Sequence, residues 1–272
     1  MHDHSGGTAP MTITRLHTDA TRYRAFARAQ ARRARRLPRD VVTQRVEEAF
    51  RDLCRALQPT LSLEVGAHEA GFSRWLKQEV TDARCVAFEA NPYVHEKYDS
   101  ALAGTGVEYH QLAVSDVDGT VELGIPRQLH NTRRGRRFRK LRTSRMASLS
   151  THRYATLTET VPVRSVQLDD FVRVTDDDVV VAWIDVEGAS RSVLVSGTEV
   201  LSRASVVYIE VENEQVWDGQ WLDIDVARFL GECGLVPVLR DVQRRHQYNV
   251  VFAAADLADH PMITRLRDEV YR

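Results

Sequence analysis

Acidic side chains stand at the ends of apolar, strand-like runs, and the first two have the spacing of a nucleoside-binding site. The run Thr60–Val65 carries Glu64 and leads into small residues that begin with Gly66, while the run Ala83–Glu89 ends in Glu89 itself. Small residues let a ligand approach the backbone closely, and the start of the following helix supplies free N–H groups. A carboxylate at the tip of the next strand can accept hydrogen bonds from two ribose hydroxyls.

Two further acidic pairs could carry acid–base chemistry. Asp185 and Glu187 follow the most apolar run of the chain, Val179–Val186, and Glu210 and Glu212 end the next strand-like run. Residues two apart on a strand share a face, so each pair is expected to point together. A carboxylate there could take a proton from a hydroxyl, with Asp185 the first choice and Glu187 the second. Asp185 and Glu212 could also hold Mg2+ through oxygen ligands, although such pairs are also found as purely structural groups.

Other reactive residue types give weaker signals. Nothing in their spacing marks three histidines as alternative bases, namely His95, His110 and His152. The cysteines are far apart in apolar contexts, which predicts reduced core residues of a cytoplasmic protein and no cysteine-bound metal; they are Cys54, Cys85 and Cys233.

The elements that would position these groups alternate between strand-like and helix-like patterns from residue 60 onward. This alternation predicts an α/β fold with a mostly parallel sheet, closed by an antiparallel pair at Leu235–Leu239 and Gln247–Ala253. A third strand is expected over Val107–Val114, and Asp118-Gly119 predicts a turn after which Val121–Leu123 folds back. Residues 1–18 are expected to be a disordered tail, residues 19–58 a helical extension, and residues 59–272 the main domain.

Charge is balanced overall but uneven along the chain. The 272 residues carry a net charge of −1, yet arginines crowd residues 22–39 and 133–145. The second cluster predicts a basic surface loop or lid over residues 127–147, where Arg133, Arg134 and Arg136 would bind an anionic acceptor. A solvated charge run is the alternative interpretation of both clusters. No apolar run is long enough to cross a bilayer, and no general nucleic-acid footprint is present.

Five segments in order resemble the FkbM family of S-adenosylmethionine-dependent methyltransferases. They are Glu64-Val-Gly-Ala-His-Glu-Ala-Gly-Phe-Ser73, Ala87-Phe-Glu-Ala-Asn-Pro92, Leu112-Ala-Val-Ser-Asp-Val-Asp-Gly119, Val161-Pro-Val with Leu168-Asp-Asp-Phe171, and Ile184-Asp-Val-Glu-Gly-Ala189. The resemblance covers roughly residues 60–254. It implies a Rossmann-like class I fold with a seven-stranded sheet, and O-methylation of a small-molecule or glycan hydroxyl.

The resemblance also implies roles for individual residues. S-adenosyl-L-methionine would be bound by Glu64, Gly66, Ala67, His68, Glu89, Ala90, Ala113, Val114, Ser115 and Asp185. Ser148 corresponds to a Ser-rich patch near the acceptor pocket of relatives. The lid lies outside the resemblance, and the residues alone predict that its arginines and Glu210 contact the acceptor. Many relatives have Asn and Gly where this chain has His68 and Ala70, and alanine takes a positive φ less readily than glycine.

Rival functions remain open at this point. Asn91-Pro-Tyr93 is similar to a motif of amine-directed methyltransferases but follows the second strand instead of the fourth. A nicotinamide dehydrogenase would need Gly-x-Gly-x-x-Gly, and Gly66-Ala-His-Glu-Ala-Gly71 lacks the middle glycine. The Arg-rich segments leave an RNA methyltransferase or a polyanion-binding protein as the alternative function. A homo-oligomer is neither predicted nor excluded.

Overall fold

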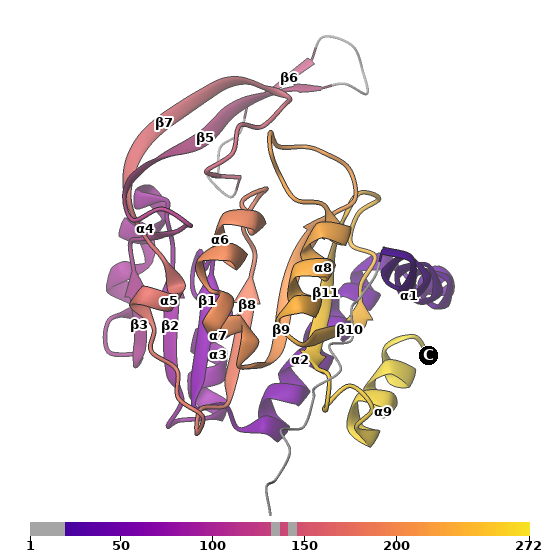
Figure 1. Ribbon diagram of the computed structural model, residues 1–272. Helices are drawn as coiled ribbons and strands as arrows, with labels where there is room; N and C mark the ends of the chain where they lie inside the picture. The colour runs from indigo at the N-terminus through magenta and orange to yellow at the C-terminus, as the bar shows by residue number, and fades with distance from the viewer. Residues whose placement is uncertain (1–19, 132–136, 141–145) are drawn as a thin grey trace, which may run out of the picture.

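A computed structural model describes residues 20–131, 137–140 and 146–272, and its central feature is a seven-stranded sheet (Figure 1). The strands, in spatial order, are β10 (Leu235–Arg240), β11 (Gln247–Ala254), β9 (Ala204–Glu212), β8 (Val180–Ile184), β1 (Leu61–Val65), β2 (Arg84–Phe88) and β3 (Val107–His110). Neighbouring pairs from β9 to β3 run parallel, and β11 runs antiparallel to both β9 and β10. The predicted Rossmann-like, mostly parallel sheet is therefore confirmed.

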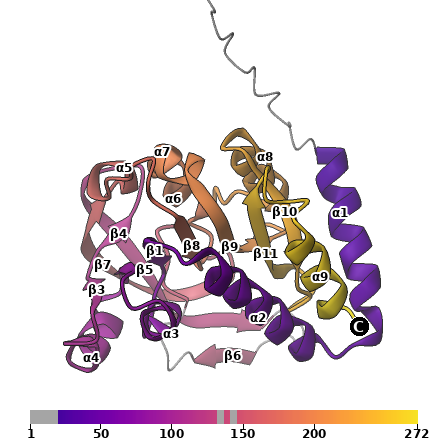
Figure 2. The ribbon, with the colours of Figure 1, turned by 90° about the horizontal axis from the view of Figure 1, so that it is seen from below.

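Helices cover both faces of this sheet (Figure 2). One layer holds α5 (Leu168–Phe171), α6 (Ser190–Ser196), α7 (Thr198–Ser202) and α8 (Asp223–Glu232). The other holds α2 (Arg39–Leu57), α3 (Gly71–Glu79) and α9 (Pro261–Val270). At the two edges, α1 (Ala20–Arg33) packs against β10 and α8, and α4 (Pro92–Leu102) packs beside β3. A short 3-10 turn, Ala34–Arg36, joins α1 to the loop before α2.

Apolar spacing explains how these layers form. Val42, Val46, Phe50 and Leu53 recur at helical spacing and are buried on the sheet-facing side of α2. The Phe50 ring lies 5.9 Å from Trp183 on β8, between centroids, so α2 is fixed to the centre of the sheet. Because α2 precedes β1 and runs antiparallel to it, its first turns reach the edge where the parallel strands end.

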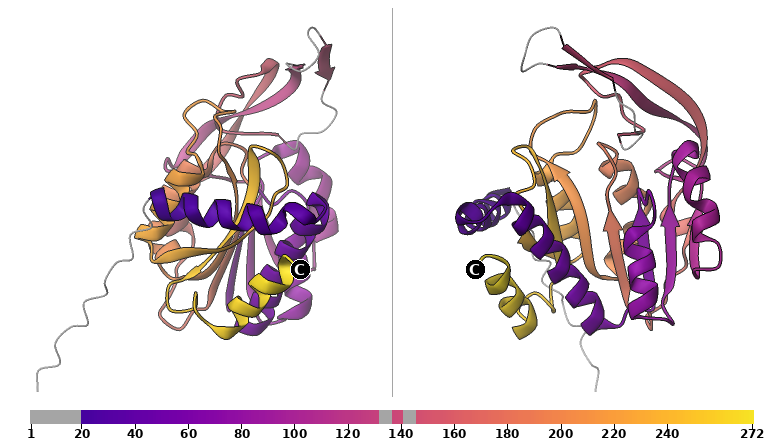
Figure 3. Two further views of the ribbon diagram at one scale, coloured as in Figure 1. Left: turned by 90° about the vertical axis from the view of Figure 1, so that its right-hand side faces the viewer. Right: turned by 180° about the vertical axis from the view of Figure 1, so that it is seen from behind.

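A second sheet arches over that edge (Figures 1 and 3). Its strands, in spatial order, are β4 (Ala113–Val114), β7 (Ala155–Val166), β5 (Gly119–Asn131) and β6 (Arg137–Lys140). The long antiparallel pair β5–β7 forms a curved ribbon. Its inward positions Leu123, Ile125 and Val163 are buried.

This ribbon corrects three expectations. Residues 127–131 and 137–140 belong to strands, so the predicted surface loop over 127–147 is wrong for these two stretches; residues 146 and 147 lie in no strand. The segment around Val121–Leu123 pairs with β7, some forty residues further along the chain, and not with the preceding strand. The expected strand Val107–Val114 is divided, because Ala113 and Val114 leave the main sheet to pair with β7. Local pattern misses such pairings, since the partner strand is distant in sequence.

Candidate functional site

A cavity of about 950 Å3 lies where the parallel strands end, beneath the β5–β7 ribbon. Strand register explains which side chains meet there. Val65, Phe88, Ile184 and Ile209 form one row across β1, β2, β8 and β9. The next residue along each strand direction is Gly66, Glu89, Asp185 or Glu210, and all four line the cavity.

The glycine of that row is required by close backbone packing. Gly66 has φ +79°, and a Cβ at this position would lie 1.9 Å from the backbone oxygen of Asp185. Its N–H and that of Ala67 both donate to the carbonyl of Phe88, at 3.0 and 2.9 Å. These contacts hold the loop across the ends of β2 and β8. Ala67 and His68, which the sequence predicted to bind the cofactor, line the cavity.

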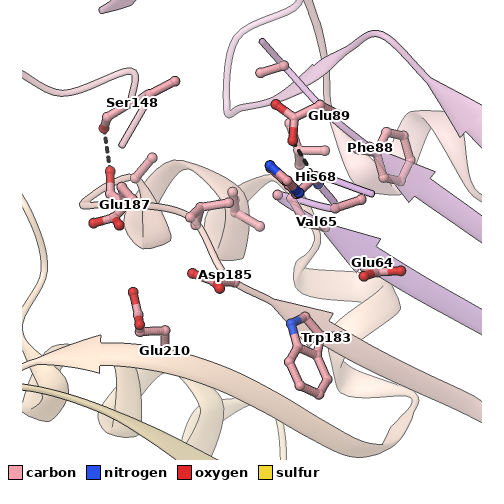
Figure 4. Close-up of a pocket in the computed structure, with 18 of the residues that line it drawn as sticks. Glu64, Val65, His68, Phe88, Glu89, Ser148, Trp183, Asp185, Glu187 and Glu210 are labelled. Atoms are coloured by element: carbon pink, nitrogen blue, oxygen red, sulfur yellow. Dashed lines mark hydrogen bonds between the residues drawn. The ribbon is translucent and has the colours of Figure 1, made fainter. Parts of the chain in front are cut away.

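Glu89 lies at one end of the cavity (Figure 4). Each of its carboxylate oxygens accepts one backbone hydrogen bond of 2.8 Å, from His68 and from Asn91. Burial raises the pKa of Glu89, and the two N–H donors oppose that rise. A carboxylate oxygen has two acceptor sites, so one site on each oxygen is left for two further donors. This arrangement can accept the adjacent hydroxyls of a ribose.

Glu64 serves the helix that follows it. Its two carboxylate oxygens accept the N–H groups of Phe72 and Ser73, at 3.2 and 2.7 Å, in the first turn of α3. Such bonds satisfy donors that have no partner within the helix. Burial raises the pKa of Glu64 to about 7. Glu64 also lines the cavity, but its carboxylate holds the first turn of α3 against the end of β1.

An apolar wall stands beside Glu89. Phe88, Leu112, Ala113 and Val114 line this part of the cavity, and the partly exposed Ala90 adjoins them. Such a surface can pack against the face of a purine base. Ser115, predicted to contact the cofactor, is not in the described lining; it is buried, and its N–H donates to the carbonyl of Val166. Ser115 lies away from the cavity because the preceding residues, 113–114, pair with β7.

The opposite end of the cavity is acidic. Glu187, Glu210 and Glu212 bring carboxylate oxygens within 4.8 Å of one another. Burial and the charge of Asp185 raise the pKa values of Glu187 and Glu210, and they raise that of Glu212 to about 7. Glu210 also accepts a hydrogen bond of 2.7 Å from Gln247. Of the three, Glu187 and Glu210 belong to the described cavity lining, and Glu212 lies behind them. Together the three side chains can hold protons or a cation.

Asp185 lies between the two ends (Figure 4). The sequence predicted that Asp185 and Glu187 share one face of a strand. This prediction is wrong, because β8 ends at Ile184 and both residues lie in the turn that follows. Asp185 is exposed to the cavity, and it is not part of the three-carboxylate group that could hold a metal. Its charge raises the pKa values of acids on both sides, Glu89 and Glu64 among them.

Ser148 connects the ribbon to this centre. Its hydroxyl donates to the carbonyl of Glu187 and accepts the N–H of Ser150 at 2.9 Å. Its backbone pairs with Gly124 of β5 in both directions. Ser148 lines the cavity, but its hydroxyl proton is used within the protein.

Other predicted residues lie elsewhere. Arg133, Arg134 and Arg136 fall outside the described residues. The described cavity lining does not include His95, His110 or His152. His152 is buried against Trp217, and desolvation lowers its pKa. The three cysteines are free and buried, as expected.

Sequence reasoning missed one wall of the cavity. Glu47 and Arg51 of α2 line it, together with Gln243 and Arg244 from the β10–β11 connection and Gln247 at the start of β11. The signal in the sequence was the four-residue spacing of polar side chains on α2, beside the apolar stripe that packs on the sheet.

The family model for the FkbM methyltransferase domain matches residues 64–237, which is more than half of the chain. The chain belongs to the FkbM methyltransferase family. The match begins at Glu64 and ends in β10, so it contains the loop after β1, Glu89, Asp185 and the acidic centre. The family is S-adenosylmethionine-dependent, and α1 and α2 lie outside the matched residues.

Solved structures with similar folds are distant. A methyltransferase FkbM from Methylobacillus flagellatus is 10% identical, with a TM-score of 0.46; the similarity covers 72% of this chain and 44% of that one. A 1,6-didemethyltoxoflavin-N1-methyltransferase from Burkholderia thailandensis is 12% identical, with a TM-score of 0.38 and coverages of 92% and 94%. A precorrin-6y C5,15-methyltransferase from Geobacter metallireducens is 13% identical, with a TM-score of 0.36 and coverages of 73% and 86%.

No protein of curated function matches the chain significantly. Among the described residues, no helix has the length and apolar character needed to span a membrane.

Proposed function

We propose that this FkbM family member is an S-adenosylmethionine-dependent O-methyltransferase that acts on a hydroxyl of a sugar, glycan or natural-product intermediate. The observation that supports this most is the register row, in which Glu89 and Asp185 stand on opposite sides of Gly66. Adjacent strands are about 4.8 Å apart, so two strand steps separate these carboxylates by roughly 10 Å. That span suits a nucleoside at one end and a reacting methyl group at the other.

The cavity fits the cofactor in three respects. Glu89 keeps one acceptor site on each oxygen for the ribose hydroxyls, and Phe88, Leu112 and Val114 offer an apolar surface for the adenine. The backbone at Gly66 leaves no room for a side chain, so this loop can closely approach a ligand. A volume of about 950 Å3 is large enough for the cofactor together with an acceptor.

The protein would contribute alignment and deprotonation. S-adenosylmethionine, when bound, supplies a methyl group on a sulfonium whose bonding pair leaves with the sulfur. Asp185 is proposed to accept the proton of the acceptor hydroxyl as its oxygen bonds to the methyl carbon. Glu187 and Glu210, whose pKa values are raised, could then take up that proton. The negative charge of Asp185, which raises the pKa values of these neighbours, also favours a sulfonium cation beside it.

The nature of the acceptor is a finer proposal. The predicted anionic acceptor rested on Arg133, Arg134 and Arg136, outside the described residues. Asp185, Glu187 and Glu210 make the described acceptor end acidic, which favours a neutral hydroxyl compound. Mg2+ also stays a prediction. The oxygen donors that could hold it are Glu187, Glu210 and Glu212, whereas Asp185 of the predicted pair stands apart from them.

A methyl-transfer screen tests the proposal. Labelled S-adenosylmethionine would be incubated with the protein and a panel of nucleotide-sugars and glycosylated metabolites, and products would be examined by mass spectrometry for a methyl-sized gain. With any acceptor that reacts, Asp185→Asn should lower kcat by about 100-fold or more, the range expected for a general base. Asp256→Asn, an exposed aspartate outside the described lining, is the matched control. Full activity of Asp185→Asn would exclude this base, and binding of NAD without S-adenosylhomocysteine would exclude the function.

A further inference from the structure

The loop that follows β1 has a strained backbone. Three alternate residues take positive φ angles, namely Gly66 at +79°, His68 at +49° and Ala70 at +50°. Only glycine enters this left-handed region without steric cost, because a Cβ there lies too close to a backbone carbonyl oxygen. Such residues persist where the surrounding structure fixes them, and they are frequent at sites that bind ligands. Contacts from the rest of the chain must therefore hold this loop.

His68 is held by hydrogen bonds from two other strands. Its N–H donates to Glu89 at 2.8 Å, and its carbonyl accepts the phenol of Tyr109 on β3 at 2.5 Å. The two peptide groups that flank its Cα are therefore both fixed. Ala70 is held more locally, because its N–H donates to the carbonyl of Ala67 at 2.7 Å. The left-handed conformation of His68 thus depends on residues that lie far from it in sequence.

Tyr109 is itself held in place and remains a hydrogen-bond donor. Its ring stacks on the imidazole of His95 from α4, with 4.6 Å between the ring centroids and 6° between the planes. Burial and the charges of Glu89 and Glu64 raise the pKa of Tyr109 well above its ordinary value. The side chain is therefore a protonated phenol throughout the neutral pH range.

These contacts reach the proposed ribose site through Glu89. One oxygen of Glu89 accepts the N–H of His68, so the position of that peptide helps to set the orientation of the carboxylate. Figure 4 shows His68 and Glu89 side by side at this end of the cavity. Tyr109 is not part of the described cavity lining, so its effect on a bound nucleoside would pass through these two residues.

Resting on the proposed function, we propose that Tyr109 is a positioning residue for the cofactor, whose phenol holds the His68 backbone so that Glu89 faces the ribose before binding. A carboxylate that is already in place loses less freedom when the ligand binds, and the affinity is higher for that reason. The inference adds the edge strand β3 to a site whose carboxylates follow β2 and β8.

Calorimetric titration of S-adenosylhomocysteine into the full-length protein tests this inference. Tyr109→Phe removes the phenol O–H and keeps the ring, and it should raise Kd by about tenfold, the contribution of one hydrogen bond. Tyr271→Phe is the matched control. The Tyr271 phenol also donates to a backbone carbonyl at 2.5 Å, that of Arg240, and Tyr271 is outside the described cavity lining. Both variants should melt slightly below the wild type, but Tyr271→Phe should keep Kd within about twofold.

A second background separates positioning from general packing. Glycine takes the left-handed conformation without steric cost, so in His68→Gly the phenol is no longer needed to hold it. Adding Tyr109→Phe to His68→Gly should therefore change Kd by less than about threefold, compared with about tenfold in the wild type.

Three results would overturn the inference. They are wild-type affinity in Tyr109→Phe, an equal loss of affinity in Tyr271→Phe, or an equal cost of Tyr109→Phe in the wild-type and His68→Gly backgrounds. Each differs from failure of the proposed function, because in each the wild type still binds S-adenosylhomocysteine. Failure of the function would show as no such binding by the wild type, and the inference would fall with it.

Discussion

The two ends of the cavity both place carboxylates in buried surroundings, but they do so with different partners. At the nucleoside end, Glu89 accepts one backbone N–H on each oxygen. At the acidic end, Glu187, Glu210 and Glu212 lie close together, and Asp185 adds to their repulsion. Backbone donors stabilise the charged form of a carboxylate, whereas like charges favour its protonated form.

This difference indicates that the two ends of the cavity have different chemical roles. A carboxylate fixed by backbone donors is a rigid hydrogen-bond acceptor, which suits recognition of a ligand that must not move. Carboxylates that compete for protons near neutral pH suit proton uptake during a reaction. The two ends should therefore respond differently to substitution and to pH.

The largest effect of a substitution on ligand binding and stability is expected at Gly66, where the nucleoside end of the cavity packs against the end of β8. Gly66→Ala should abolish measurable binding of S-adenosylhomocysteine and lower stability by more than about 3 kcal/mol, because the new Cβ would meet the backbone of Asp185 at 1.9 Å. Gly104→Ala is the matched control, since Gly104 has φ +77° with no atom within 4 Å. It should cost only about 1 kcal/mol, the strain of the left-handed backbone. Calorimetry and thermal melting would measure both, and equal effects would contradict the proposed packing role.

The carboxylates of the acidic end should make the free energy of unfolding depend on pH. The pKa of Glu212 is raised from 4.5 to about 7, so the folded state holds its proton more tightly than the unfolded state does. Its contribution is fully present below pH 4.5 and is lost as the pH rises through about 7. Glu212→Gln should therefore lessen the decline in unfolding free energy between pH 5 and pH 8, by about 1–3 kcal/mol. Chemical denaturation at several pH values measures this. Glu232→Gln, an exposed glutamate on α8, should leave the decline unchanged.

A smaller effect is expected at the contact between the ribbon and the acidic end. Ser148→Ala removes a hydrogen bond to the Glu187 carbonyl and one from the Ser150 N–H. Stability should fall by about 1–2 kcal/mol, and the Michaelis constant of the acceptor should rise while S-adenosylhomocysteine affinity stays constant. Ser202→Ala is the control, because Ser202 is exposed and its hydroxyl donates to the Thr198 carbonyl within α7. A change confined to S-adenosylhomocysteine affinity would place Ser148 with the nucleoside end instead.

The parallel sheet and the acidic residues at its carboxyl edge could be predicted because short local stretches of the sequence carry the pattern for each. Each of Glu64, Glu89 and Asp185 ends or closely follows an apolar strand of ordinary length, and parallel strands bring such ends to one edge. Short strand-like runs separated by amphipathic segments favour right-handed crossovers between parallel strands, so the mostly parallel arrangement of the main sheet followed from the alternation.

The rest depended on contacts between distant segments. The basic residues near β6 gave no apolar alternation, yet backbone ladders hold that strand to β5. Ser115 was lost to the cavity because β4 pairs with β7, which lies fifty residues away. Glu47 and Arg51 lie in the expected helical extension, and only the antiparallel placement of α2 against β1 brings them to the cavity.

The central claim is that Glu89 holds the cofactor's ribose while Asp185 faces the reacting end. Calorimetric titration of S-adenosylhomocysteine into the wild type, Glu89→Gln, Asp185→Asn and the control Glu69→Gln tests it most directly. Glu89→Gln should lose about 2–3 kcal/mol, roughly 30-fold or more in Kd, because the new amide presents donors where acceptors are needed. Asp185→Asn and Glu69→Gln should stay within about threefold of the wild type. Unchanged affinity in Glu89→Gln, in a protein that melts as the wild type does, would contradict the claim.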